Sequence, residues 1–379
     1  MNKIYLLTAA FAVMASLSGC SDTELASIDT AQEKTPIGFH TVGSQMGSRA
    51  QSINTEKLKG YNFNVYAFAR NEADASDGAL FMGTEDTQPG NGGVTISHNG
   101  SNWNYADPNN LKYWPTGALN FYAVSPVSKS ESVPTAYTWQ ISQNTKVINY
   151  LSSDEYGNGT FPYTDVMYAI ALNRSKTENG GKVQLQFRHI TSQVVFMAKK
   201  QLSDMVVKIK SIKLHNFDTS GTFSIPTNGT DPQQSNWKTT YILNKSGFTV
   251  IKDEEIDVKT DATDISTRKP MFLIPQQKGA WIPSHNIATA DNNEECYLSI
   301  DCNIYVNGSY EVGSAGSYGT IYVPFKADWQ PGKRYVYTLV FGGGYDANGH
   351  AILQPINFEP DVQAWKEDAT TGNDILLYQ

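Results

Sequence analysis

Apolar and polar residues alternate one by one along four stretches of this sequence, which is the period of a β-strand with one buried face. The stretches are residues 61–68, 182–188, 296–306 and 334–341. Almost no run repeats apolar residues every three or four positions, as an amphipathic helix does. Clusters of Gly, Asn and Pro between the stretches are typical of turns. The pattern predicts an all-β chain of half-buried antiparallel strands that form a sandwich, a barrel or both.

The first twenty residues predict where the chain is delivered. Lys3 precedes an apolar run, residues 4–15, that is too short to span a bilayer as a helix. The run leads to Leu-Ser-Gly-Cys at 17–20, which is similar to the lipobox of bacterial lipoproteins. We therefore expect a signal peptide over residues 1–19 and a diacylated Cys20 as the mature N-terminus. The alternative is an ordinary secretory signal with an incidental cysteine.

An acidic leader, residues 20–34, follows the expected cleavage site. Its start, Ser-Asp-Thr-Glu at 21–24, resembles the surface-export signal of lipoproteins in Bacteroidetes-type bacteria. This resemblance implies a protein on the outer leaflet of the cell outer membrane that faces outward. A solvated leader whose acidity is chance is the alternative.

Length predicts two domains, because about 360 residues remain after the leader peptide and a domain takes roughly 150. The polar stretch 173–181 breaks the strand pattern near the middle of the chain and is the candidate linker. We expect an N-terminal domain over 35–175 and a C-terminal domain over 176–365. The formal net charge is −8 and no basic cluster is present, which excludes nucleic acid as a partner.

No motif supports catalysis, a metal or a cofactor. The six histidines are too far apart in sequence to predict a zinc site, and phosphate-loop, dinucleotide and Gly-x-Ser-x-Gly motifs are missing. His189 shares a strand face with apolar residues, which favours a buried, hydrogen-bonded group. Cys296 and Cys302 lie on one strand about 20 Å apart, so we expect buried free thiols. Paired-carboxylate hydrolysis depends on spatial pairing that a sequence does not show, but nothing here favours it.

Several segments, in this order and spacing, resemble the fimbrillin family, the subunits of type V pili of Bacteroidales. The segments are 111–115, 119–126, 164–169, 185–189, 192–196, 272–276, 329–335 and Trp365. The resemblance covers nearly the whole chain. It implies two tandem transthyretin-like (Ig-like) antiparallel β-sandwich domains and export as a lipoprotein. It also implies polymerisation by donor-strand exchange, after an arginine-specific protease removes the first strand.

The sequence contains the parts that this mechanism needs at the N-terminal end. Ile37 and Phe39 lie on the same face of a short strand over 35–42. A segment of mostly small, polar residues follows this strand. Arg49 lies in that segment, so we expect cleavage between Arg49 and Ala50. Removal of the strand would expose a sheet edge and an apolar groove to another subunit. The alternative is that Arg49 is an ordinary loop residue.

The C-terminal tail, residues 366–379, is the candidate donor. A polar spacer after Trp365 leads to the apolar end Ile375, Leu376, Leu377 and Tyr378. Fourteen extended residues reach roughly 45 Å, which is enough to cross to a neighbouring subunit. The competing interpretation is a terminal edge strand of the chain's own domain.

We therefore predict a structural or adhesive subunit of a surface pilus (fimbrium), without enzymatic activity. Its expected partners are other pilus subunits, the outer membrane through the lipid, and host or bacterial surface ligands. The alternative is a cell-surface glycan-binding lipoprotein that stacks sugars on exposed tryptophans, although tryptophan in a sandwich usually belongs to the core. The candidates are Trp103, Trp114, Trp237, Trp281 and Trp329.

Overall fold

The computed structural model describes residues 34–43, 55–84, 92–127, 137–152, 165–240, 247–251, 255–266, 271–342, 347–348 and 357–364. Its strands and helices all belong to one compact unit, Thr35–Gln379. Most of the described residues lie in strands, and the α-helices α1 (Thr55–Leu58) and α2 (Ile287–Asn292) are short. The prediction of a mostly β chain is confirmed. None of the described helices is long and apolar enough to cross a membrane.

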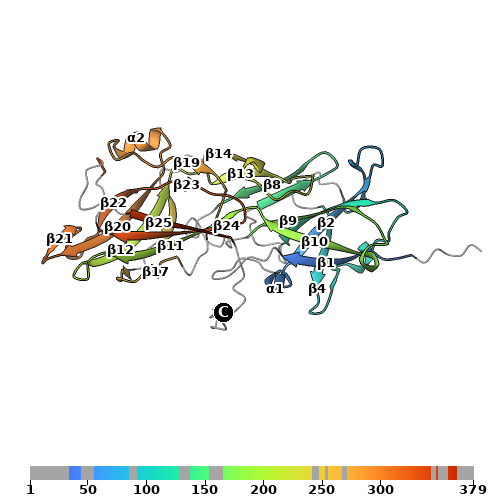
Figure 1. Ribbon diagram of the computed structural model, residues 1–379, viewed down its shortest axis with the longest axis horizontal. Coiled ribbons are helices and arrows are strands. Elements are labelled where there is room, and N and C mark those ends of the chain that lie inside the picture. Colours follow the sequence, from blue (N-terminus) through green and yellow to red (C-terminus); the bar gives the residue numbers. More distant parts are fainter. Residues whose placement is uncertain are drawn as a thin grey trace, which may run out of the picture. The chain divides into compact units, whose positions relative to one another are not determined.

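An eight-stranded sheet contains the first strands of the chain, in the order β1-β10-β9-β6-β2-β4-β5 with β3 paired to β2 (Figure 1). Its strands are β1 (Gly38–Gly43), β2 (Asn62–Arg70), β3 (Asp77–Met82), β4 (Val94–His98), β5 (Trp103–Tyr105), β6 (Leu119–Val127), β9 (Met167–Arg174) and β10 (Lys182–His189). A four-stranded sheet has the order β14-β13-β8-β7. Its strands are β7 (Tyr137–Ile141), β8 (Lys146–Leu151), β13 (Ser220–Ser224) and β14 (Trp237–Thr240).

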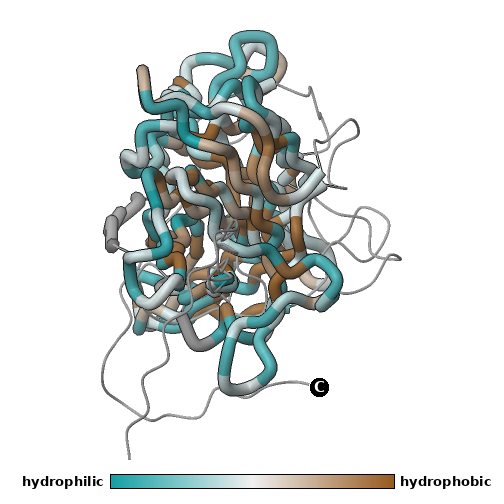
Figure 2. Tube along the Cα trace, turned by 90° about the vertical axis from the view of Figure 1, so that its right-hand side faces the viewer, coloured by the Kyte–Doolittle hydropathy of each residue, from teal (hydrophilic) through white to brown (hydrophobic). Residues whose placement is uncertain are grey.

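Both faces of the eight-stranded sheet carry buried apolar side chains. On one face, Tyr66 and Tyr122 belong to a core shared with the four-stranded sheet, which contributes residues such as Trp139. The opposite face carries a second core with Phe63 and Phe187. The central strand β2 therefore has six consecutive buried residues rather than a strict alternation. Figure 2 shows the same distribution, with apolar segments inside and polar residues on the outer turns.

Two further sheets, of five and six strands, enclose a third core that includes Phe196, Ile300 and Trp329. The five-stranded sheet contains β11 (Ser192–Lys200), β17 (Thr263–Asp264), β18 (Met271–Leu273), β24 (Lys333–Phe341) and β25 (Asn357–Ala364). The six-stranded sheet contains β12 (Val206–His215), β15 (Phe248–Ile251), β16 (Ile256–Asp257), β20 (Tyr297–Val306), β21 (Ser309–Val312) and β22 (Gly319–Pro324). A small ladder joins β19 (Gln277–Lys278) to β23 (Ala327–Asp328).

Two pairings correct the expectation of purely antiparallel sheets. β1 pairs with β10 in parallel, and β11 pairs with β24 in parallel. Parallel neighbours need long crossover connections, and alternation along one strand does not report the direction of its partner. The sheets are therefore mixed.

The polar stretch 173–181 connects two adjacent strands of one sheet. β9 ends at Arg174, and β10 begins at Lys182 and pairs with β9. Gly180 and Gly181 have positive φ values of 64° and 80°, which suit a tight turn. The expected domain division after residue 175 thus falls between two strands of the same sheet. In addition, β13 and β14, which lie after residue 175, belong to the same sheet as β8, which lies before it.

Candidate functional site at strand β1

Strand β1 is the end strand of the eight-stranded sheet as described. Its backbone pairs with β10 from Gly38 opposite Lys182 to Gly43 opposite Phe187 (Figure 1). The segment just before β1 also has neighbours on the other side. The Ile37 amide donates to the Lys112 carbonyl at 2.9 Å, and the Trp114 amide donates to the Thr35 carbonyl at 3.0 Å.

Alternate side chains of this segment enter the core. Ile37, Phe39 and Thr41 are 1 %, 5 % and 5 % exposed, whereas His40 is exposed. The Phe39 ring packs edge-on against Phe121 with centroids 6.3 Å apart. The two residues predicted to share a strand face therefore both lie in the buried core of the sheet.

The opposite end of the sheet approaches the same segment through β5. The Tyr105 hydroxyl donates to the Ile37 carbonyl at 3.1 Å, and its ring lies 6.0 Å from Phe39. A tyrosine hydroxyl is protonated at neutral pH, and burial raises the pKa of Tyr105 further, to about 12. The sheet thus curls until its first and last strands nearly meet, and the Phe39 side chain fills the space between them.

Trp114 fixes the start of the segment. Its indole Nε1 donates to the Gly181 carbonyl at 2.9 Å, and its ring packs edge-on against Phe121. A Cβ on Gly181 would lie 2.9 Å from Thr35 Cγ2, so only glycine allows this close approach. The alternation pattern gave no sign of Tyr105 or Trp114 as contacts of β1. The partner of Tyr105 lies 68 positions away in sequence and that of Trp114 lies 67 positions away, although 111–115 was among the family-like segments.

The other predicted parts of the mechanism lie outside the described residues. They are Cys20, the expected cleavage pair Arg49 and Ala50, and the donor residues Ile375, Leu376, Leu377 and Tyr378. Of the predicted site residues, the structure places only Ile37 and Phe39.

The remaining candidates for chemistry are structural. His189 is buried and its Nδ1 lies 2.7 Å from Asp165 Oδ1, which confirms a buried, hydrogen-bonded group. Cys296 and Cys302 are buried free thiols, as predicted. Within the described ranges, no three His, Cys, Asp or Glu side chains are close enough together to hold a metal ion.

Three of the five tryptophans considered for glycan stacking are in the core. Trp237, Trp281 and Trp329 are at most 8 % exposed, and each indole nitrogen donates to a protein oxygen. These positions are not exposed platforms, because the three side chains are packed into hydrophobic clusters, as is usual for tryptophan in a sandwich. Trp103 and Trp114 are partly exposed.

The chain is similar to a known sequence family and to solved structures. The sequence model of a family described as fimbrillin-like matches residues 48–365. The crystal structure of a fimbrial protein from Bacteroides vulgatus has a TM-score of 0.56 and 16 % identity, and the match covers 87 % of this chain and 99 % of that one. A putative cell adhesion protein from Bacteroides uniformis gives a TM-score of 0.44 at 14 % identity, over 88 % of this chain and all of the other. No curated protein sequence matches the chain.

Proposed function

Because the chain belongs to the fimbrillin-like family, we propose that it is a fimbrial, cell-adhesion protein of the bacterial surface, with a structural rather than an enzymatic role. Its partners in this proposal are other subunits of the pilus. The observation that carries the proposal is the position of β1, an end strand whose inward side chains are part of the core.

Assembly follows from what the loss of β1 would leave behind. Burial of side chains such as Ile37 and Phe39 stabilises by about 1.5–3 kcal/mol each. Their removal would open a groove beside Phe63 and Phe121 and leave β10 with an unpaired edge. A strand from another subunit could restore both the ladder and the apolar contacts, which is donor-strand exchange.

The parts outside the described residues complete the proposal. Lipid on Cys20 would hold the exported chain at the outer face of the outer membrane. Cleavage between Arg49 and Ala50 would release the segment that contains β1. The apolar tail at 375–378 would then enter the groove of the next subunit, with alternate side chains in the places of Ile37 and Phe39.

The proposal includes the finer architecture of two tandem transthyretin-like (Ig-like) sandwiches. The first would be formed by the eight- and four-stranded sheets around their shared aromatic core. The second would be formed by the five- and six-stranded sheets. This assignment places β10, β13 and β14 in the first sandwich.

The proposal is tested by treating the purified protein with an arginine-specific protease. We expect cleavage after Arg49 and ordered polymers in negative-stain electron microscopy. Arg49→Ala should stop both, and Arg70→Lys, which removes an arginine from β2, should leave both unchanged. Deletion of 375–379 should allow cleavage but prevent polymers. Polymers formed by Arg49→Ala, or by the deletion variant, would contradict the proposal.

A further inference from the structure

A polar concavity of about 350 Å³ lies over the outward face of β9 and β10. Because Val183, Leu185 and Phe187 of β10 enter the core, the intervening side chains face outward. The concavity is lined by Ile170, Leu172, Arg174, Asn179, Gln184, Gln186, Arg188 and Gly229. Gly229 belongs to the loop 225–236, which joins β13 to β14 and forms the opposite wall.

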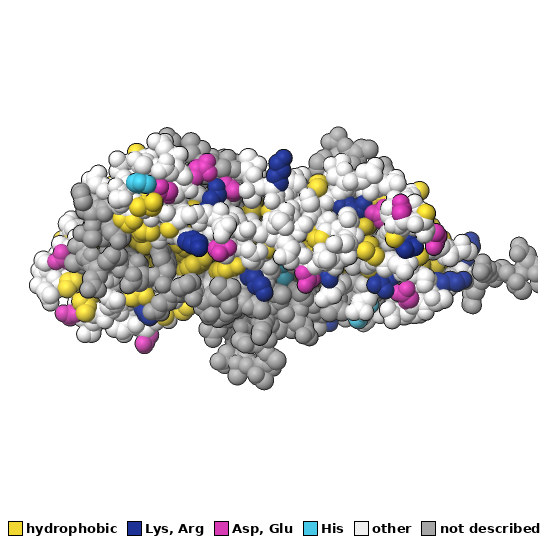
Figure 3. Space-filling view, turned by 45° about the horizontal axis from the view of Figure 1, so that its top comes forward, with side chains coloured by type: hydrophobic (Ala, Val, Ile, Leu, Met, Phe, Trp, Pro, Cys, Tyr) yellow, Lys and Arg dark blue, Asp and Glu magenta, His cyan; other side chains and the backbone are white. Residues whose placement is uncertain are grey.

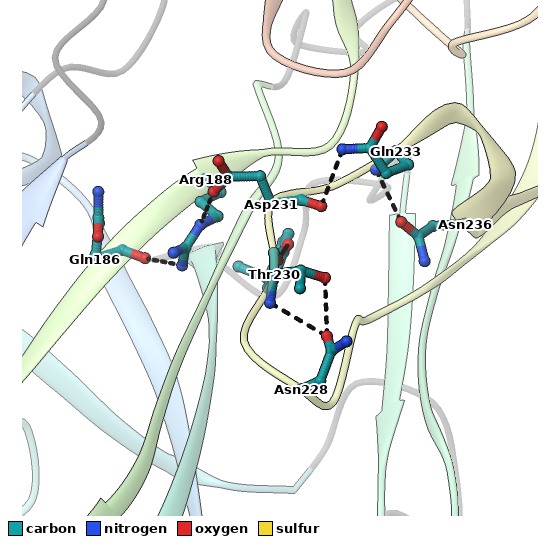
Figure 4. Close-up of polar contacts among 8 residues, drawn as sticks. Gln186, Arg188, Asn228, Thr230, Asp231, Gln233 and Asn236 are labelled. Carbon is teal, nitrogen blue, oxygen red and sulfur yellow. Dashed lines mark hydrogen bonds and ion pairs between the residues drawn. The ribbon is translucent and has the colours of Figure 1, made fainter.

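This loop is ordered by its own side chains. Asn228 Oδ1 accepts hydrogen bonds from the backbone amide and the hydroxyl of Thr230, at 3.2 and 2.8 Å. Asn236 Oδ1 accepts from the Gln233 amide at 2.8 Å. Figure 4 shows these contacts beside Arg188. The wall is therefore built without a ligand, which reduces the entropy cost of binding.

The charges at the concavity are balanced. Arg188 Nε lies 2.7 Å from Asp231 Oδ1, as Figure 4 shows. Arg174 Nη1 lies 2.8 Å from Glu178 Oε2. An anionic ligand would thus meet two guanidinium groups that already have carboxylate partners. Elsewhere, one face of the molecule also shows basic and acidic side chains interspersed (Figure 3). This balance favours a neutral ligand over a carboxylate or phosphate.

The neutral hydrogen-bonding side chains of the lining are amides. In the part of the chain that the structure describes, the side chains of Asn179, Gln184 and Gln186 have no hydrogen-bond partner in the protein. Each offers one acceptor oxygen and one NH₂ donor. Gln184 and Gln186 share a strand face, about 7 Å apart, so two pairs of donors and acceptors lie along one line. Ile170 and Leu172 add an apolar floor.

We propose that this concavity binds the end of a neutral saccharide, one or two pyranose rings in size. Neighbouring ring hydroxyls match the paired donors and acceptors of the glutamine amides, and the C–H face of a ring suits the apolar floor. The volume is at the lower end of the roughly 300–1,000 Å³ of small-molecule sites. The site does not depend on β1 exchange, so it goes beyond the function proposed above.

Saturation-transfer difference NMR tests the proposal on the purified full chain. The neutral probes are glucose, galactose, mannose and N-acetylglucosamine, and the anionic probes are glucuronate and N-acetylneuraminate. We expect at least one neutral probe to bind, and Gln184→Ala/Gln186→Ala to weaken it tenfold or more. Gln277→Ala removes an exposed strand glutamine outside the concavity and should change nothing. No neutral binding, or equal binding by the double variant, overturns the proposal.

A charge variant tests the selectivity separately. Asp231→Asn leaves Arg188 without its carboxylate, so glucuronate binding should rise about tenfold. Unchanged glucuronate binding, or wild-type binding of anionic probes alone, contradicts the charge argument and overturns the neutral ligand class. Arg49→Ala should bind saccharide as the wild type does. The saccharide test therefore has an outcome that does not depend on whether strand exchange takes place.

Discussion

The rings of Phe39 and Phe63 meet edge to face, with centroids 6.0 Å apart and planes at 84°. This is a favoured geometry of aromatic pairs, because the positive edge of one ring meets the negative face of the other. Phe63 also lies 5.4 Å from Phe187 of β10. The contact therefore links the end strand to the centre of its sheet and to its backbone partner, and Phe39 is the main anchor of β1.

Replacement of this anchor gives the first prediction. Phe39→Ala should lower the free energy of unfolding by about 3–4 kcal/mol, since it leaves a cavity beside the rings of Phe63, Tyr105 and Phe121. His40→Ala, one residue away and exposed, should change it by less than about 0.5 kcal/mol. Guanidinium unfolding followed by tryptophan fluorescence measures both. Equal effects of the two variants would show that β1 is not held by its inward face.

A buried ion pair supports the second prediction. Lys146 Nζ lies 2.7 Å from Asp77 Oδ2, with side chains only 4 % and 8 % exposed, and it also lies 4.8 Å from the Phe68 ring centroid. Lys146→Met leaves a buried, unpaired carboxylate and should cost about 3–5 kcal/mol. The exposed partner of a surface pair, Glu72, can be changed to Ala for less than about 1 kcal/mol.

The Lys146→Met/Asp77→Asn variant distinguishes an unpaired charge from lost packing. If the charge causes the loss, the double variant should be more stable than Lys146→Met alone, because no buried carboxylate remains. The measurement is again guanidinium unfolding. A double variant as unstable as the sum of the two single changes would argue that the pair has no special coupling.

The strand positions were predictable because alternation is a local property of the chain. The segments at 182–188, 296–306 and 334–341 became β10, β20 and β24 within a residue or two at each end. The segment at 61–68 became β2, but its alternation predicted only one buried face, whereas both faces of β2 are buried. The second face is buried because other parts of the chain pack against it.

Pairing partners were not predictable, because they are set by contacts between distant parts of the chain. Ile37 and Phe39 could be assigned to one strand face from the sequence, but β10 as their parallel neighbour could not. The turn at 173–181 resembled a linker because Gly and polar residues suit both roles. The concavity lined by Gln184 and Gln186 also required the structure, since its far wall comes from a loop about 40 residues further along.

The two cysteines of β20 give a prediction about reactivity. Both are fully buried, and burial raises the pKa of Cys296 to about 12 and that of Cys302 well above its usual range. The reactive thiolate is thus nearly absent at pH 8. In a Cys20→Ser variant, Ellman's reagent should react with both thiols in guanidinium at least a thousandfold faster than in the native protein. Rapid native labelling would contradict their burial.

His215 gives a prediction about pH. It lies at the end of β12 and stacks on Tyr297 of β20, with centroids 4.4 Å apart and planes at 10°. Its Nε2 lies 2.8 Å from Ser299 Oγ. Burial lowers the pKa of His215 to about 4, with Lys213 acting in the same direction and Asp291 opposing it. The folded protein therefore holds the imidazole neutral.

The unfolded chain binds a proton on His215 below a pKa of about 6.5, so it holds more protons than the folded chain between pH 6.5 and 4. The stability from the neutral ring is fully present above pH 6.5 and decreases as the pH falls toward 4. Between pH 7 and 4.5, wild type should lose about 2–3 kcal/mol more than His215→Gln, which cannot titrate. Ser299→Ala keeps the buried ring and should retain the wild-type slope. Parallel curves for wild type and His215→Gln in urea unfolding would mean that this ring is not buried in its neutral form.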